Sequence, residues 1–511
     1  MKGRKCIIFL GVIAVVCVLL APFSTSAAEK RLVIAIPQEP TTLDPSLIVT
    51  GPDFVVVENW GEYLLSTTQN GDLKPRLATS WKVSPDGKKI DFTMRKGVKF
   101  HSGDVLTARD VEFSFDRGRT KNPTTRSLLI LMERLEVVDD YHFTIHFKTP
   151  DVGFIPTQAG RVAIVSKRYY ERVGEDKFVR QPVGTGPYKV VHSASGEYFD
   201  LERFEEYWGE KPSVKQARFY FVPEDTTRIA KIQTGEVDLI VGCPYPSVRD
   251  MEKRPGLKVV RVESNHPSPS VIFATRNPKV PWHDQRVRLA MAHAIDWSAI
   301  VKNLLHGIPN HWALIAPYEL GYDPSLKPYA YDPKKAKELL TEAGFSKGFD
   351  FKLYYPITGR IPMVREIAEA VASYLEAVGI RPKLVAEEFA ALLARRRASK
   401  GPDAEFVYIF SLPVAGGPTS TYFLSQSFTG EGGTSVYFNP KYESTITEAR
   451  ATMDETKRAE LVKRAVKILY EDVALIPIFN MVTVYVMREN IDFKPTRYYT
   501  DPIHVKDITV K

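Results

Sequence analysis

The chain has 511 residues and a formal net charge of +8, and 44% of its residues are hydrophobic. This length is sufficient for two or three domains, each with its own core. The positive charge is spread along the chain without a block of like charges, so neither nucleic-acid binding nor attachment to a membrane surface is indicated.

The first 28 residues have the pattern of a secretory signal peptide. Three basic residues within the first five precede an apolar run over residues 7–20, and small residues lead up to Ala28. An apolar run of this length is short for a membrane span. We therefore expect cleavage after Ala28 and export to the periplasm, with an uncleaved anchor as the less favoured alternative.

The cysteine content excludes an internal disulfide after this cleavage. Of three cysteines only Cys243 lies beyond residue 28. The core must then hold the exported fold unaided, and we expect a monomer. A lone cysteine without an identifiable histidine partner is more typical of a packed side chain than of a nucleophile.

In the first half, short strands alternate with an amphipathic helix. Residues 32–36 read as a buried strand that leads into a loop containing three prolines, residues 37–45. Alternating apolar side chains predict strands over 90–94 and 143–147. Thr107, with Asp110 three residues later, predicts a helix start. This alternation is typical of the α/β class.

The second half contains a hairpin, several helices and a final strand. Turn residues separate two apolar segments of the hairpin, and three segments repeat apolar residues at helical spacing. The predicted segments are the hairpin 188–204, the helices 287–295, 367–375 and 455–471, and the strand 481–487. No Pro- or Ser-rich linker separates these segments, so any domains must be joined by short crossings.

No catalytic or metal-binding motif has adequate context. Gly184 to Gly186 resembles only the start of a dinucleotide-binding turn, and Pro187 removes a backbone donor that a phosphate loop needs, so a tight turn is favoured. His283 with His293, like the later pair around residue 308, has no ligand spacing typical of a metal site. We expect no enzyme activity, no cofactor and no metal; a secreted hydrolase remains a remote alternative.

Aromatic residues make up 11% of the chain, and some of them lie in loop-like surroundings. Trp312 follows a proline-containing loop, and Tyr422 follows the pair Gly416 and Gly417. Rigid aromatic side chains with a few polar groups suit a pocket that closes over a ligand, although local packing explains any single one of them equally well.

A series of short motifs now indicates a family. They are PTTLDP (40–45), LATSW (77–81), FTMR (92–95), GVKFHSG (97–103), LTARDV (106–111), GTGPY (184–188), YWG (207–209), GEVD (235–238), RVRLA (286–290) and AID (294–296). In this order along the chain they resemble the family 5 extracellular solute-binding proteins, which include receptors for oligopeptides, dipeptides, nickel and opines.

The resemblance implies the type II periplasmic binding protein fold, with two lobes, a hinge and an inserted extra domain. It implies a first lobe from residues 29–60, 181–270 and 480–511, an inserted domain over 61–180, and a second lobe over 271–479. It also implies that a peptide or peptide-like solute is captured between the lobes and delivered to the permease subunits of an ABC importer.

The motif that holds the ligand's ammonium group in peptide-binding members of the family is altered here. Its Gly-Trp pair corresponds to Phe410 and Ser411, and its Asp corresponds to Val414. No acidic residue occurs between Phe406 and Gly430. An ammonium buried beside a valine would lack a partner, which costs about 2–5 kcal/mol. A free-amine dipeptide is therefore a poor candidate, and an opine, an oligosaccharide or another non-peptide solute is the alternative.

Further ligand contacts follow from the same resemblance. Arg360 lies two residues from the position at which dipeptide receptors place an arginine, and it could receive a carboxylate. Thr41 and Thr42, in the loop after the first strand, complete the set of expected contacts together with Trp312, Tyr422 and the glycine pair. The chelating histidine of nickel receptors has no counterpart over residues 406–425, so nickel is disfavoured.

Overall fold

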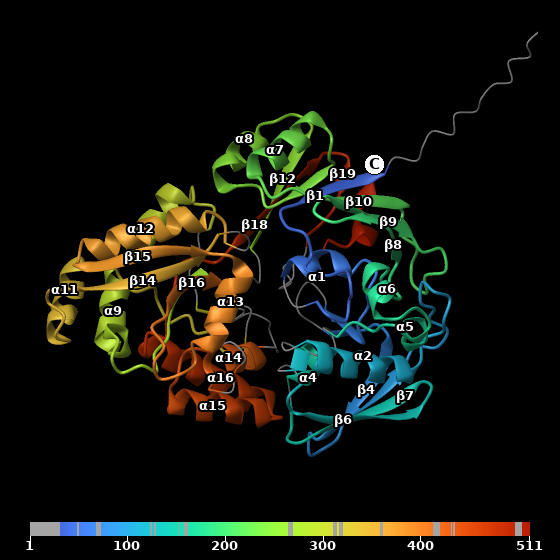
Figure 1. Cartoon of the computed structure of the whole chain (residues 1–511), viewed down its shortest axis with the longest axis horizontal. Coiled ribbons are helices and arrows are strands. Elements are labelled where there is room, and N and C mark those ends of the chain that lie inside the picture. The colour runs from blue at the N-terminus through green and yellow to red at the C-terminus, as the bar shows by residue number, and fades with distance from the viewer. Residues whose placement is uncertain are drawn as a thin grey trace, which may run out of the picture.

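The computed structural model shows two α/β lobes side by side, joined at one end, with a smaller domain beside the first lobe (Figure 1). The predicted signal peptide lies outside the described residues, and no helix among them is both long and apolar enough to cross a membrane. The described residues are 31–48, 51–67, 73–122, 125–126, 129–151, 153–157, 162–263, 269–309, 314–315, 320–357, 361–411, 420–430, 432, 435–495 and 503–511.

The first lobe is built on a seven-stranded sheet. Its order is β12 (Leu257–Glu263), β18 (Val482–Arg488), β11 (Leu239–Val241), β1 (Leu32–Ile36), β10 (Gln216–Phe221), β9 (Tyr198–Arg203) and β8 (Tyr188–Ala194). β1 runs parallel to both β10 and β11, and the other pairs are antiparallel. The helices of this lobe include α1 (Gly51–Val57), α7 (Asp225–Thr234) and α8 (Val248–Glu252). The predicted first strand, hairpin and final strand are confirmed.

The small domain is a four-stranded antiparallel sheet covered by helices. The strand order is β4 (Ala78–Val83), β5 (Lys89–Met94), β7 (His142–Phe147) and β6 (Met132–Asp139). The helices are α2 (Ala108–Lys121), α4 (Phe154–Thr157), α5 (Lys167–Val173) and α6 (Glu175–Arg180). The backbone N–H of Thr107 donates to Asp110 Oδ2 at 2.8 Å, which confirms the predicted helix start. The two strands predicted from alternation are also confirmed.

The second lobe is a five-stranded sheet with helices on both faces. The order is β15 (Ile380–Glu387), β14 (Phe349–Pro356), β16 (Val407–Ser411), β13 (Pro269–Phe273) and β17 (Leu475–Pro477). α9 (Gln285–Ala294), α11 (Pro333–Glu342) and α12 (Val364–Glu376) contribute to the core on one face. α13 (Phe389–Ala398), α14 (Ser420–Phe428), α15 (Pro440–Ala451) and α16 (Glu455–Glu471) contribute to the core on the other. The three helices predicted here are confirmed.

Two neighbouring crossings connect the lobes. The chain leaves the first lobe after β12 and enters the second at β13, and it returns from β17 to β18. β12 pairs with β18, and β13 pairs with β17, so the strands that flank the two crossings lie beside one another in each sheet. A connection through two chain segments allows the lobes to rotate while each sheet stays intact.

Two of the family motifs meet at the fully buried carboxylate of Glu62. It accepts hydrogen bonds from Arg76 Nε at 2.9 Å, Thr185 Oγ1 at 2.8 Å, Tyr207 Oη at 3.0 Å and Trp208 Nε1 at 2.8 Å. Its charge is therefore both paired and hydrogen bonded, as a buried carboxylate requires. The motifs at residues 184–188 and 207–209 thus hold the junction between the first lobe and the small domain.

The glycine turn that carries Thr185 depends on a close backbone approach. A Cβ added to Gly184 would lie 1.9 Å from the carbonyl oxygen of Trp60. Only glycine allows the two backbones to come this close. The turn is tight, as predicted, and its role here is structural.

A second buried ion pair ties the proline-rich loop to the small domain. Arg117 Nη2 donates to Asp44 Oδ2 at 2.6 Å and to Glu175 Oε1 at 3.0 Å. Asp44 is fully buried. The acidic residue of the motif at 40–45 therefore anchors the loop that follows β1.

Candidate functional site between the lobes

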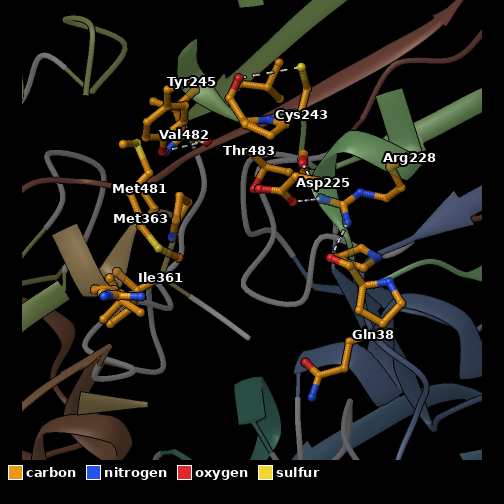
Figure 2. Close-up of a pocket in the computed structure, with 18 of the residues that line it drawn as sticks. Gln38, Asp225, Arg228, Cys243, Tyr245, Ile361, Met363, Met481, Val482 and Thr483 are labelled. Carbon is orange, nitrogen blue, oxygen red and sulfur yellow. Dashed lines mark hydrogen bonds and ion pairs between the residues drawn. The ribbon is translucent and has the colours of Figure 1, made fainter. Parts of the chain in front are cut away.

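A cavity of about 640 Å³ lies between the two lobes next to the crossings (Figure 2). A volume of this size suits a small solute. The first lobe and the returning strand contribute Pro37, Gln38, Glu39, Pro223, Asp225, Thr226, Arg228, Gly242, Cys243, Pro244, Tyr245, Met481, Val482, Thr483 and Val484, and the second lobe contributes Ile357, Ile361, Pro362, Met363, Val364, Arg365 and Glu366.

The position of the cavity follows from the direction of the strands. Pro37, Pro223 and Gly242 each follow the carboxyl end of one of the parallel strands β1, β10 and β11. On the opposite wall, Ile357 follows the carboxyl end of β14. Open α/β sheets bind ligands outside the carboxyl ends of their strands, where the loops diverge.

The wall nearest the crossings is mainly apolar. Met363 and Met481 lie close to Tyr245 and Ile361 in Figure 2. The Tyr245 hydroxyl donates to the carbonyl oxygen of Val482 at 3.0 Å, so its polar end is already engaged. Methionine side chains are flexible and polarisable, and they adapt to ligands of irregular shape.

Arg228 brings a charge to the cavity but is held by the protein. Its guanidinium donates to the carbonyl oxygens of Val222 at 2.7 Å, Pro223 at 2.9 Å and Gly242 at 2.9 Å. It also forms an ion pair with Asp225. The side chain therefore joins the loops at the strand ends and shapes the cavity.

Cys243 does not have the environment of a nucleophile. It is buried, and its Sγ lies 3.7 Å from the carbonyl oxygen of Pro244. Burial raises the pKa of the thiol to about 12. A thiolate, the reactive form, is therefore scarce at neutral pH.

The small domain contacts the second lobe. Arg450 Nη2 lies 3.8 Å from Asp151 Oδ1, and both side chains are largely shielded from solvent. A Cβ added to Gly153 would lie 3.7 Å from the Cβ of Tyr422. The two lobes are thus connected both by the chain crossings and through contacts of the small domain.

Of the residues expected to touch ligand, four can be located with their side chains, and none of them lines the cavity. Thr41 donates through its backbone N–H and its Oγ1 to Asp53 Oδ1, at 2.6 and 2.9 Å. Thr42 Oγ1 accepts from the backbone N–H of Asp44 at 3.0 Å. Phe410 is buried in the second lobe, and Tyr422 is buried among residues of the small domain.

The remaining expected contacts cannot be compared with the structure. Trp312, Arg360, Val414, Gly416 and Gly417 lie outside the described residues. Ser411 ends β16, and its side chain is not among those described.

Sequence reasoning missed Gln38, Met363 and Met481 as cavity residues. The signal for the first was present, since Gln38 stands just beyond a predicted strand, but Thr41 and Thr42 were favoured instead. The two methionines come from segments more than one hundred positions apart, and no local pattern relates them. Their proximity follows from the pairing of the lobes.

The histidines that were considered as metal ligands are used locally. His283 Nδ1 lies 2.8 Å from the carbonyl oxygen of Thr275, and His293 Nδ1 lies 2.7 Å from that of Ala330. Among the described residues, no three His, Cys, Asp or Glu side chains form a group that could hold a metal ion.

The two sheet-based lobes, the paired crossings and the cavity between them define a two-lobed binding protein. The family model for bacterial extracellular solute-binding proteins, family 5, matches residues 72–435, which is more than half of the chain. The chain belongs to this family, as its motifs predicted, and its fold is that of the type II periplasmic binding proteins.

Known relatives extend the similarity to nearly the whole chain. The dipeptide-binding protein of Escherichia coli is 28% identical, over 96% of both chains. The glutathione-binding protein GsiB of Salmonella paratyphi A is 28% identical, over 90% of both chains. The solved structure of the ABC transporter-associated protein DppA from Helicobacter pylori, in complex with the peptide STSA, has a TM-score of 0.82 and 26% identity, covering 94% of this chain and 98% of that one.

Proposed function

We propose that this protein captures a peptide or peptide-like solute outside the cytoplasmic membrane and delivers it to the permease of an ABC importer. The observation that carries this proposal is the cavity shared by the two lobes beside the crossings. A ligand there touches both lobes at once. Its binding energy therefore favours the closed conformation, which is the form that a permease distinguishes from the open one.

The proposal assigns the two lobes and the inserted domain to the residue ranges expected from the sequence. It includes export through a cleaved leader, residues 1–28, and action as a monomer that binds no nucleic acid. Chemistry on the solute plays no part, since closure alone retains and releases it. The relatives named above are binding proteins, which supports this assignment.

Solute binding can be tested by blocking the cavity. Thr226 lines the cavity, whereas its neighbour Thr227 on α7 does not, and both are exposed. We expect Thr226→Trp to abolish the thermal stabilisation that a bound solute produces, which is about 2.7 kcal/mol at one hundred times Kd. Thr227→Trp is the matched control and should retain it.

The screen should include peptides, glutathione, opines and oligosaccharides, with closure followed by small-angle scattering. A solute that stabilises the protein, compacts it and loses both effects in Thr226→Trp supports the proposal. Stabilisation without compaction, or equal effects in the two tryptophan variants, would contradict it. Turnover of the bound compound would instead favour the hydrolase alternative.

A further inference from the structure

Arg396 is a buried cation in the second lobe that has no counter-ion among the described residues. It lies on α13, its exposed fraction is 2%, and its Nε and Nη2 atoms form no hydrogen bond within this part of the chain. Arginine remains protonated in proteins, so this charge cannot be removed by titration. Buried charges are otherwise paired, because leaving water uncompensated is costly. The missing partner therefore requires an explanation.

The immediate surroundings of Arg396 are aromatic. Its Cζ lies 5.6 Å from the ring centroid of Tyr408 and 5.3 Å from that of Phe410, both on β16. Phe389 stacks on Phe410 with a centroid distance of 5.6 Å. The Tyr408 hydroxyl is buried beside the guanidinium and interacts with it, and it has no further partner among the described residues. The rings attract a cation only weakly compared with a full counter-charge, and they leave polar atoms unsatisfied.

The nearby charges that act on this region are positive. Burial lowers the pKa of Lys400, and the charges of Arg276, Arg396 and Arg397 lower it further. By contrast, Arg395, one residue before Arg396, forms an ion pair with Glu387. The segment from 406 to 430, which includes β16, contains no acidic residue. An anion brought to this region would therefore be attracted.

Arg396 lies outside the lining of the cavity described above, so a group of the solute must extend beyond that cavity to reach it. Figure 1 shows α13 on the edge of the second lobe that faces α1. Phe410 lies at the carboxyl end of β16, which is parallel to β14, and β14 leads into the cavity wall at Ile357. The carboxyl ends of parallel strands share one edge of a sheet, where ligands bind.

We propose that Arg396 binds a carboxylate of the solute, and that the solute of this receptor is an acidic compound. The carboxylate oxygens would accept hydrogen bonds from Nε and Nη2 in the two-point geometry that guanidinium and carboxylate share, and the Tyr408 hydroxyl would donate a third. The inference rests on the proposed function. It deepens that function, because it names the class of solute that the second lobe selects.

The test compares Arg396→Met with Arg397→Met, an exposed position next to it on the same helix. The probes are glutathione, Glu-Glu and octopine, each paired with the derivative in which its carboxylates are amides. We expect at least one carboxylate probe to raise the melting temperature of the native protein. Its affinity should fall roughly tenfold or more in Arg396→Met and in the amide form, while Arg397→Met retains it.

Stability without ligand separates a binding role from a structural one. If the guanidinium of Arg396 is unpaired until an anionic solute binds, Arg396→Met should have the same melting temperature as the native protein without ligand, or a higher one. A lower ligand-free melting temperature in Arg396→Met, equal binding of acid and amide, or no stabilisation by any carboxylate probe overturns the inference. If a neutral solute binds and closes the lobes while Arg396→Met has no effect, this inference fails and the proposed function stands.

Discussion

Glu62 in the first lobe and Arg396 in the second are both buried charges, but their surroundings differ. Glu62 accepts four hydrogen bonds, one of them from a cationic partner, whereas two guanidinium nitrogens of Arg396 lack an acceptor among the described residues. A buried charge with a full set of partners is tolerated in the scaffold, whereas an unpaired one is costly until a counter-charge reaches it. The contrast suggests that rigid construction belongs to the first lobe and solute selection to the second.

The largest expected effect on stability comes from removing the Glu62 carboxylate, whose hydrogen bonds are all formed. Glu62→Ala leaves the buried guanidinium of Arg76 without its carboxylate partner. We expect the free energy of unfolding to fall by about 3–5 kcal/mol, measured by urea denaturation. Arg396→Met in the same assay should cost nothing. A loss below about 1 kcal/mol for Glu62→Ala would remove the contrast between the lobes.

The backbone approach beside Glu62 gives a second test of the scaffold. Gly184→Ala places a methyl group 1.9 Å from the Trp60 carbonyl oxygen. The turn that carries Thr185 must move, and we expect a loss of about 2–3 kcal/mol by the same denaturation measurement. Gly401→Ala is the control, since a Cβ there meets no atom within 4 Å. Equal stabilities of the two variants would contradict the close approach.

A smaller effect is expected where the small domain touches the second lobe. Arg450→Met leaves the Asp151 carboxylate without the guanidinium that faces it. If the contact forms on closure, the closed population falls, and the apparent affinity for solute falls with it by roughly fivefold. Calorimetry measures the affinity and small-angle scattering the compaction. Arg464→Met, an exposed position on α16, should leave both unchanged.

The smallest effect concerns acid stability at the partly exposed end of the Arg117 network. Hydrogen bonding to Arg117 lowers the pKa of Glu175 from 4.5 to about 2. A lowered pKa means that the ionised form stabilises the fold, so this contribution is present above pH 4.5 and is lost as the pH falls toward 2.

On acidification from pH 4.5 toward 2, the free energy of unfolding should therefore decrease less in Glu175→Gln than in the native protein. The difference should be less than about 1 kcal/mol, because the side chain of Glu175 is one-third exposed. Urea denaturation at several pH values measures the change. Glu171→Gln, an exposed change on α5, is the control. An identical acid dependence in the two variants would show that the Arg117 pair does not contribute.

Local patterns in the sequence were sufficient for some of the elements and for the family. The alternation at 90–94 and the helical spacing at 455–471 predicted β5 and α16, because side-chain periodicity follows directly from backbone geometry. The motifs predicted the family, and with it the two-lobed fold. The valine-rich segment 481–487 predicted a strand, but nothing in its residues indicates that this strand lies between β11 and β12.

Tertiary structure decided the use of the individual side chains. Thr185 and Glu62 are 123 positions apart, yet they share a hydrogen bond. Met363 and Met481 belong to different lobes and reach one cavity. Arg396 is one of three consecutive arginines, and only the packing of α13 against β16 distinguishes it from its neighbours. Solvation and pairing depend on which distant segments pack together, so periodicity along the chain predicts the elements but not the charges that they bury.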